Sequence, residues 1–374
     1  MKKEFFSKIG INGERLLIKE PAGPENYIYN IINALAKIDS ANEYTIYLTK
    51  NPESDYFNKL TNANSKFKFK VIKSSLSWTQ SGLALELHKN PVDIFFTAVH
   101  TMPIFHSKKT KFVAMIHGLE YKYQKGNEFL LEGPTRYTVK HSDLVIVPSD
   151  FTLAEILNKK WKVSPDKIKV VPEGVGENFY KRHSLEIAPI LDKYRLKTRN
   201  YLLYVSTIQP RKNLPKLIEA FSLIVKKDPT LKLAVSGKLG WGYEESLAAP
   251  RKFGIEDNVI FLQRTTDEDL PALFSGALMY VSTSFEEGFG LTLLEAMACE
   301  TPCLVSDIPS FKALGENLVS YVDPNAVSSI KIGIEQLTQN YPTIEFLQKA
   351  AEHAKNYTWE KTAKATLDFI QGLH

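Results

Sequence analysis

Residues 279–307 read MYVSTSFEEGFGLTLLEAMACETPCLVSD and place four structural elements in one short run. The pattern predicts a strand over 279–282, a glycine-containing loop over 287–290, and a helix over 291–299 whose apolar spacing fits packing on a sheet. Thr301 and Pro302 end that helix before a second strand begins. The glycines let backbone N–H groups approach an anionic ligand where the loop meets the helix.

Two carboxylates lie in this frame, Glu287 in the loop and Glu295 on the helix, with seven residues between them. Each can accept hydrogen bonds from sugar hydroxyls, so the stretch predicts a site for a phosphorylated sugar or a nucleotide. The alternative is purely structural. In that case Glu287 is solvated and Glu295 stabilises the start of the helix through the helix dipole.

The run EGFGLTLLEAMAC, followed by TP and SD, resembles the glutamate-x7-glutamate motif of glycosyltransferase family 4. This family, also called glycosyl transferases group 1, contains retaining nucleotide-sugar glycosyltransferases. The resemblance implies an α/β chain of the GT-B fold: two Rossmann-like domains with parallel sheets facing across a cleft, and a C-terminal helix that crosses back to the N-terminal domain. Glu300 departs from the pattern, because the family usually has glycine after AMAC.

The composition is that of a folded soluble protein, with 374 residues, 44% hydrophobic and 24% charged. This length exceeds one ordinary core and predicts two domains. No apolar run approaches the roughly 18 residues of a membrane helix, and the lysine-bearing start has no signal-peptide core, so we expect a cytoplasmic location. The two cysteines, Cys299 and Cys303, are expected to be small buried hydrophobes.

The order of elements along the chain gives two α/β halves. Strands are expected over 8–12, 43–49, 67–72, 92–96, 112–116, 144–148, 201–206, 232–236 and 258–263. The expected domains are residues 1–178 on the acceptor side, residues 179–356 on the donor side and a crossover helix over 357–374, with a linker near 173–200. No GxGxxG follows the first strand, which disfavours a dinucleotide dehydrogenase.

Two adjacent cations, Arg211 and Lys212, precede the helix expected after strand 201–206, and Asn213 is expected to cap that helix. Cations at a helix N-terminus are unfavourable to the helix dipole unless an anion lies between them, and a diphosphate would supply that anion. The alternative is two solvated cations in a loop.

The resemblance assigns roles to further residues. It implies that Arg211 and Lys212 contact the donor diphosphate, Glu287 the donor sugar and Glu295 the ribose, while His117 faces the donor sugar and the reaction centre. Gly118 follows His117 where several subfamilies have aspartate. The catalytic residues expected are Glu287, His117, Arg211 and Lys212, and the donor-binding residues are Gly23, Arg264, Gly288, Phe289, Gly290, Leu291 and Glu295. His100 is expected on the acceptor side.

Asp267 and Asp269 form a DxD pattern, which holds a divalent metal in another class of glycosyltransferase. Here the two residues begin an expected helix, so capping explains them better than metal binding. We therefore predict no metal ion and no cofactor other than the nucleotide-sugar substrate.

The positive charge lies in the N-terminal half: residues 1–178 hold 25 Lys and Arg against 19 Asp and Glu, and the remainder holds 22 against 23. The lysines cluster at 66–73, 108–111 and 159–162. A solvated face is one explanation, and peripheral docking on an anionic membrane, at its inner face, is the other. Nucleic acid is not expected, since no recognition module accompanies the charge.

Taken together, these features and the resemblance imply a retaining glycosyltransferase that moves a hexose from a GDP- or UDP-sugar to a glycan or lipid-linked acceptor in cell-surface polysaccharide assembly. A nucleotide-sugar epimerase of the same fold remains an alternative and would convert the sugar without an acceptor. A non-catalytic sugar-nucleotide-binding subunit is a second alternative. It would be expected to have lost some of Glu287, Glu295, Arg211 and Lys212.

Overall fold

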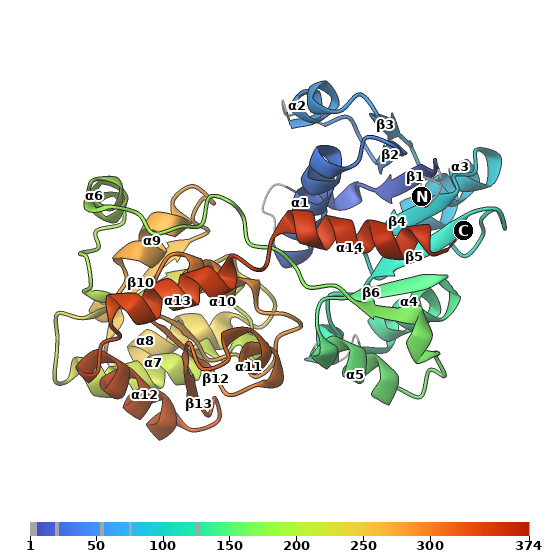
Figure 1. Ribbon diagram of the computed structural model, residues 1–374. Helices are drawn as coiled ribbons and strands as arrows, with labels where there is room; N and C mark the ends of the chain where they lie inside the picture. The colour runs from blue at the N-terminus through green and yellow to red at the C-terminus, as the bar shows by residue number, and fades with distance from the viewer. Residues whose placement is uncertain (1–5, 19–21, 53–55, 75–76, 124–127, 374) are drawn as a thin grey trace. The chain divides into compact units, whose positions relative to one another are not determined.

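The computed structural model describes residues 6–18, 22–52, 56–74, 77–123 and 128–373. Contacts divide the chain into two compact units, shown in Figure 1. Unit 1 is Met1–Gly174 with Thr358–His374, and unit 2 is Val175–Tyr357. The divisions expected from the sequence lie close by, after residues 178 and 356.

Unit 1 is built on a seven-stranded parallel sheet in the order β3-β2-β1-β4-β5-β6-β7. Its strands are β1 (Lys8–Asn12), β2 (Glu43–Leu48), β3 (Phe67–Val71), β4 (Ile94–Thr97), β5 (Lys111–Met115), β6 (Leu144–Val147) and β7 (Ile168–Val170). Strand β7 is not among those expected from the sequence. This edge strand has three residues with a lysine at its centre, too short for an apolar alternation to be visible.

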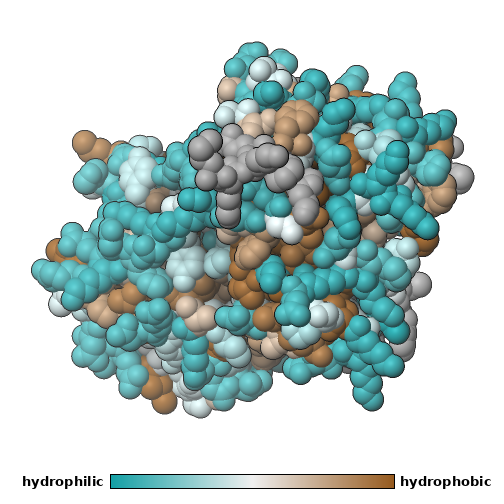
Figure 2. All heavy atoms as spheres, turned by 45° about the vertical axis from the view of Figure 1, so that its right-hand side comes forward, coloured by the Kyte–Doolittle hydropathy of each residue, from teal (hydrophilic) through white to brown (hydrophobic). Residues whose placement is uncertain are grey.

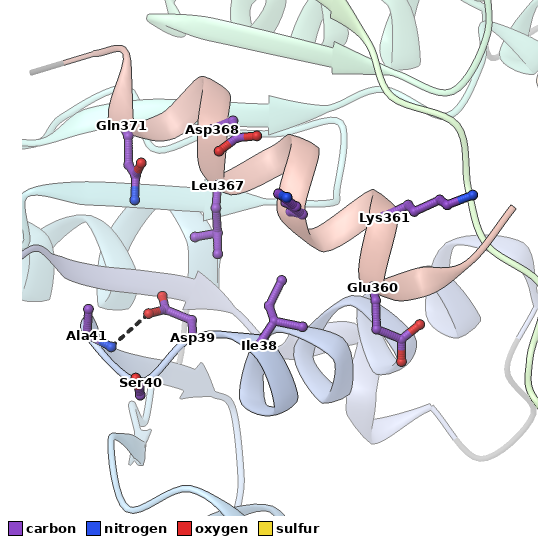
Figure 3. A pocket seen from close by; sticks show the side chains of 10 residues that line it. Ile38, Asp39, Ser40, Ala41, Glu360, Lys361, Leu367, Asp368 and Gln371 are labelled. Carbon is purple, nitrogen blue, oxygen red and sulfur yellow. Dashed lines mark hydrogen bonds between the residues drawn. The ribbon is translucent and has the colours of Figure 1, made fainter. Parts of the chain in front are cut away.

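The longer helices of unit 1 are α1 (Gly23–Ile38), α2 (Tyr56–Ala63), α3 (Ala84–Lys89), α4 (Glu128–His141), α5 (Asp150–Asn158) and α14 (Trp359–Gln371). Figure 1 shows α14 alongside α1, although the two helices come from opposite ends of the chain. Between the end of α1 and α14 lies an open pocket of about 420 Å³, drawn in Figure 3. Leu367 and Ile38 line it together with charged residues of α14.

Unit 2 is built on a six-stranded parallel sheet in the order β10-β9-β8-β11-β12-β13. Its strands are β8 (Tyr201–Val205), β9 (Lys232–Ser236), β10 (Val259–Gln263), β11 (Met279–Ser282), β12 (Cys303–Ser306) and β13 (Ser320–Val322). The helices are α6 (Ser184–Lys193), α7 (Leu214–Val225), α8 (Glu244–Phe253), α9 (Leu270–Gly276), α10 (Leu291–Ala298), α11 (Pro309–Gly315), α12 (Val327–Gln339) and α13 (Ile344–Ala354).

Both faces of the unit 2 sheet are buried, because successive residues of one strand belong to different core clusters. Tyr201 and Leu203 of β8 pack in one cluster, whereas Leu202 and Tyr204 pack in the other. A strand covered by helices on both faces has no solvated side, which explains its continuous apolar run. The two Rossmann-like parallel sheets predicted from the sequence are thus confirmed.

Each sheet has a point at which the strand order reverses. In unit 1 the reversal lies between β1 and β4, and in unit 2 it lies between β8 and β11. In open parallel sheets the connections leave two such neighbouring strands toward opposite faces, which opens a crevice outside their carboxyl ends. Ligands of open parallel sheets bind there.

The linker predicted near 173–200 is partly wrong, since this stretch contains a helix of unit 2. Helix α6 packs on α9, with Ile187 and Leu191 buried in the same cluster as Leu273. The polar composition of α6 reflects its exposed face and not an absence of structure. The chain passes between the units at Gly174 and again at Tyr357.

Helix α10 ends at a left-handed residue, Glu300, with φ of 53°. The Glu300 N–H donates to the Met297 carbonyl, and the Thr301 N–H donates to the Ala296 carbonyl. This is the Schellman arrangement, in which the left-handed residue is usually glycine because a Cβ atom is strained there. The geometry is therefore the one a glycine would favour, adopted here by a glutamate.

Replacing Glu300 with glycine is expected to stabilise the protein by about 1 kcal/mol, because the substitution removes the left-handed strain. Glu300→Ala is the matched control, since it removes the carboxylate, which lies near Lys181, and keeps the Cβ atom. The free energy of unfolding measured in urea should be higher for Glu300→Gly than for Glu300→Ala. Equal values for the two variants would contradict this account of the turn.

Candidate functional site

The loops that follow β8 and β11 are joined at the reversal point of the unit 2 sheet. The Phe285 N–H donates to the Arg211 carbonyl at 3.0 Å, and the Thr283 hydroxyl donates to the Asn213 carbonyl at 3.1 Å. In return, the Asn213 amide donates to the Thr283 carbonyl at 3.1 Å and to the Pro324 carbonyl at 2.8 Å. These bonds fix the backbone on both sides of the crevice.

The role predicted for Asn213 is wrong in one respect. It occupies the N-cap position of α7, but its backbone is left-handed and its side chain makes no capping hydrogen bond to the helix. The amide is used instead to hold the β11 loop and Pro324. Capping propensity is a local signal, and these long-range partners outweigh it.

Glu287 lies between the two cations of the β8 loop. Lys212 Nζ is 2.6 and 2.7 Å from the two carboxylate oxygens, and Arg211 Nη1 is 3.1 Å from Oε2. Arg211 Nη1 also donates to the Glu286 carbonyl at 2.5 Å. The exposed fractions of the side chains are 8% for Arg211 and 13% each for Lys212 and Glu287. The alternative of two solvated cations is therefore wrong.

The charge state of Glu287 follows from its neighbours. Burial alone would raise the pKa of this carboxyl group, but the Lys212 ammonium and the Arg211 guanidinium outweigh burial and lower the pKa to about 2. The Ser284 hydroxyl adds a hydrogen bond that acts in the same direction. The anion expected between the two cations is thus supplied by the protein itself, and the cluster of three side chains retains one net positive charge.

The loop after Glu287 leads directly into α10. Gly290 has φ of 108°, and a Cβ atom there would lie 2.9 Å from the Phe311 ring, so glycine is required on both grounds. Phe289 is buried in the core and packs edge-on against Tyr357, so only its backbone remains for a ligand. Leu291 is the first residue of the helix.

The second glutamate of the motif lies one helical turn further along. Glu295 is half-buried on α10 and close enough to Cys299 to help raise the pKa of that thiol, although burial is the larger cause. Cys299 and Cys303 are both free and buried, as the sequence predicted.

Arg264 follows β10, the edge strand of the unit 2 sheet. Its side chain is 27% exposed, and its guanidinium lies 3.8 Å from the Asp267 carboxylate. The preceding Gln263 is left-handed and accepts a hydrogen bond from the Gly237 N–H. A Cβ atom at Gly237 would overlap the Ser206 carbonyl oxygen, so the loops after β8, β9 and β10 meet too closely for any other residue there.

Helix capping does not explain Asp269, contrary to the prediction. Its carboxylate accepts hydrogen bonds from Lys193 at 2.5 Å and from Tyr194 at 2.7 Å, which attaches α6 to the start of α9. Within the described ranges no group of three His, Cys, Asp or Glu side chains is arranged to hold a metal ion. Metal independence stays a prediction about the reaction.

The remaining predicted residues lie in unit 1. His117 follows β5 and pairs with Glu173, a residue the sequence analysis did not single out. Gly23 was predicted to lie in a loop ahead of the helix. It is instead the exposed first residue of α1. His100 follows β4, beside the reversal point of that sheet. Units 1 and 2 thus each carry part of the predicted set.

Two family models match most of the chain. Residues 188–357 match the model described as glycosyl transferases group 1, and residues 21–178 match the model described as Glycosyltransferase Family 4. The first range contains Arg211, Lys212, Arg264, Glu287 and Glu295.

Several curated proteins are similar in sequence. The O-antigen chain mannosyltransferase B of Escherichia coli is 30% identical over 240 residues, covering 64% of this chain and 63% of that protein. The D-inositol 3-phosphate glycosyltransferase of Salinispora tropica is 31% identical over 241 residues, covering 60% and 50%. The O-antigen chain mannosyltransferase RfbU of Salmonella typhimurium is 26% identical, covering 65% and 64%. The alignments thus span between half and just under two thirds of these relatives.

Solved structures match over nearly the whole chain. Anabaena Alr3699/HepE in complex with UDP-glucose aligns with a TM-score of 0.76 and 15% identity, covering 98% of this chain and all of that one. WaaG, a glycosyltransferase involved in lipopolysaccharide biosynthesis, aligns with a TM-score of 0.72 and 16% identity, covering 98% and 100%. These alignments confirm the predicted GT-B fold.

The Glu287 cluster is expected to make stability depend on pH. Because its pKa is lowered in the folded protein, ionised Glu287 stabilises the fold above the ordinary value of 4.5, and this contribution is lost as the pH falls toward 2. Glu287→Gln should lower the free energy of unfolding at pH 7 by about 3 kcal/mol, since two buried cations lose their partner.

The measurement is urea unfolding of wild type and Glu287→Gln between pH 7 and pH 2.5, and the difference should shrink as the pH falls below 4.5. Glu268→Gln, at an exposed position in the same unit, should change the free energy of unfolding by less than about 0.5 kcal/mol. A constant difference between wild type and Glu287→Gln over the whole pH range would show that Glu287 is not the ionised partner of the two cations.

Proposed function

Because the chain belongs to glycosyltransferase family 4, with the GT-B fold, we propose that it transfers a hexose from a UDP- or GDP-sugar to a glycan or lipid-linked acceptor with retention of anomeric configuration. The similarity to two O-antigen chain mannosyltransferases supports a place in cell-surface polysaccharide assembly. In this proposal the reaction needs neither a metal ion nor a cofactor.

The observation that carries the proposal is the cluster of Arg211, Lys212 and Glu287 at the β8 and β11 loops. Departure of a nucleoside diphosphate builds negative charge on its phosphate oxygens, and preformed cations with little exposure to water stabilise that charge at low reorganisation cost. The cluster has one net positive charge, so a diphosphate gains attraction there without displacing Glu287. The Glu287 carboxylate then remains available to accept hydrogen bonds from sugar hydroxyls.

The other residues complete the donor site in this proposal. The backbone amides of Gly290 and Leu291, at the start of α10, donate to the diphosphate, where the helix dipole favours an anion. Glu295 accepts hydrogen bonds from the ribose hydroxyls, and Arg264 lies near the base. His117 and Gly23 belong to unit 1, and their expected roles toward the sugar and the phosphates stay predictions.

The chemical step is proposed to occur at the face from which the diphosphate leaves. The bond between the anomeric carbon and the phosphate oxygen breaks, and a bond forms from that carbon to the acceptor hydroxyl oxygen. The acceptor proton passes to the departing phosphate oxygen. No protein side chain has to act as a general base in this scheme.

The proposal predicts that nucleotide is released from at least one of a panel of UDP-, GDP- and ADP-sugars when an acceptor is present, and that EDTA does not stop the reaction. Arg211→Ala should lower kcat by about 100-fold, the cost of one preformed donor to a developing anion. Glu295→Ala should mainly weaken donor binding. Lys227→Ala, whose ammonium lies on the surface of the same unit, is the matched control and should leave kcat unchanged.

Two outcomes would contradict the proposal. Failure of every donor to bind or react would remove the transferase function. Conversion of the donor sugar without an acceptor would identify an epimerase instead.

We also propose that unit 1 makes peripheral contact with an anionic membrane that carries the acceptor. No helix within the described ranges is long and apolar enough to cross a bilayer. Figure 2 shows a mainly hydrophilic face on which hydrophobic side chains form separate groups. In the loop after β4, Ile104 is 63% and Phe105 56% exposed, and Lys108 and Lys109 are close along the chain.

Exposed apolar side chains beside lysines fit the boundary between headgroups and acyl chains. The lysines of strand β3 fit this role less completely than the sequence predicted, because Lys70 pairs with Glu86 at 2.5 Å. Lys66, whose ammonium lies over the Phe6 ring, and Lys68 remain part of the proposed basic surface.

Flotation with liposomes containing anionic lipid tests the contact. Replacing Ile104 and Phe105 together with serine should lower binding by at least about tenfold, because burial of the two side chains together contributes more than about 1.4 kcal/mol. Leu185→Ser, at a position 88% exposed on α6, is the matched control and should not change binding. Equal binding to neutral and anionic liposomes, or no effect of the double replacement, would contradict the proposed contact.

A further inference from the structure

The pairing of His117 with Glu173 joins two loops at one edge of the unit 1 sheet. His117 follows β5, and Glu173 follows β7. The imidazole Nδ1 and the carboxylate Oε1 are 3.2 Å apart, and the exposed fractions of the side chains are 11% and 7%. A buried carboxylate needs a hydrogen-bond donor, and His117 is the one that the described residues provide.

The backbone around Glu173 is held by helix α14. The Thr362 hydroxyl donates to the Pro172 carbonyl at 2.8 Å. On the other side, a Cβ atom at Gly174 would lie 2.3 Å from the Trp359 nitrogen, so only glycine fits against the start of α14. Glu173 therefore stands between two residues that fix its position.

The imidazole is held by aromatic packing as well. The Tyr27 ring meets the His117 ring edge-on, with centroids 4.9 Å apart, and packs in the same manner against Trp359 at 5.6 Å. The imidazole cannot turn without disturbing this packing. The Nδ1 to Oε1 distance is thus a property of the fold and not of a mobile surface pair.

The chemistry of the pair determines the other ring nitrogen. An ionised carboxylate can only accept, so Nδ1 carries the hydrogen, and a neutral imidazole then has its lone pair on Nε2. Nε2 is buried and has no hydrogen-bond partner among the described residues. A buried acceptor without a donor costs free energy, which a ligand hydroxyl would recover.

We propose that Glu173 is a positioning residue that holds His117 in the Nδ1–H tautomer, so that Nε2 accepts a hydrogen bond from a hydroxyl group of the sugar substrate. The inference rests on the proposed glycosyl transfer for the identity of that hydroxyl. Glu173 would thereby join the functional residues, although it lies outside the glutamate motif and the basic loop of unit 2. Glu173 acts through His117 and does not itself contact the substrate.

The tautomer is tested on the free protein, without any substrate. Long-range proton–nitrogen NMR on protein labelled at histidine nitrogen should show a protonated Nδ1 and a bare Nε2 for His117. Glu173→Gln should allow the other tautomer, since an amide can donate to Nδ1 as well as accept from it. Tyr27→Phe, which keeps the ring against the imidazole, is the matched control and should leave the tautomer unchanged.

The kinetic test is a double-mutant cycle for glycosyl transfer. Glu173→Gln should lower kcat by roughly 10- to 100-fold, the range seen when a metal-ligating histidine loses its outer hydrogen-bond partner. In a His117→Ala background the same change should have no further effect, because Glu173 acts only through the imidazole. The thermal unfolding midpoint of each variant separates this effect from a loss of folded protein.

The outcomes distinguish the inference from the proposed function. An Nε2–H tautomer, an imidazole protonated on both nitrogens, or additive effects in the cycle would overturn the role of Glu173. A wild-type protein with the predicted tautomer but no transfer from any donor would overturn the proposed function instead.

Discussion

The ion pairs of Glu287 with Arg211 and Lys212 are the interaction on which the site of unit 2 depends. Burying three charged groups costs free energy, and the short contacts of the carboxylate recover that cost only because the two loops are fixed. Hydrogen bonds between the β8 and β11 loops supply this fixed geometry. The cluster therefore exists before any ligand arrives and keeps one net positive charge for an anion.

The position of the cluster follows from the order of the strands. Because β8 and β11 are neighbours whose connections leave in opposite directions, their carboxyl ends bound a crevice in which two loops can share one ligand. Gly290 adds the backbone of α10 to the same edge, since its left-handed conformation turns the loop directly into the helix. The glutamate motif and the basic loop, far apart in sequence, thus form one site.

Much of the fold could be predicted because local patterns dominate in it. Buried strands show continuous apolar runs, and the β11 to β12 segment contains its strand, turn and helix within residues 279–307. Edge strand β7 and helix α6 were missed because neither is apolar along its whole length. The turn at Glu300 was identifiable only as a departure from a family pattern, and the structure gives the physical reason, a positive φ.

The site could be predicted in composition but not in its pairing. Arg211, Lys212 and Glu287 were all expected in the site. The sequence pointed to a ligand as the anion between the two cations, whereas Glu287, 75 positions from Lys212, is that anion. Asn213 and Asp269 were read as caps because capping is a local rule, while their actual partners are distant in sequence. Glu173 gave no signal at all, since a single glutamate after a short strand has no distinguishing pattern.

The central claim is that the cluster of Arg211, Lys212 and Glu287 receives a diphosphate. Isothermal titration calorimetry with a nucleoside, its monophosphate and its diphosphate, carried out for both uridine and guanosine, tests it most directly. The account predicts that for the preferred base the diphosphate binds more than about tenfold more tightly than the monophosphate, in line with roughly 1.5 kcal/mol for one added charge-assisted hydrogen bond. It also predicts that Arg211→Ala reduces this difference. Equal affinity for the monophosphate and the diphosphate in the wild-type protein would contradict the claim.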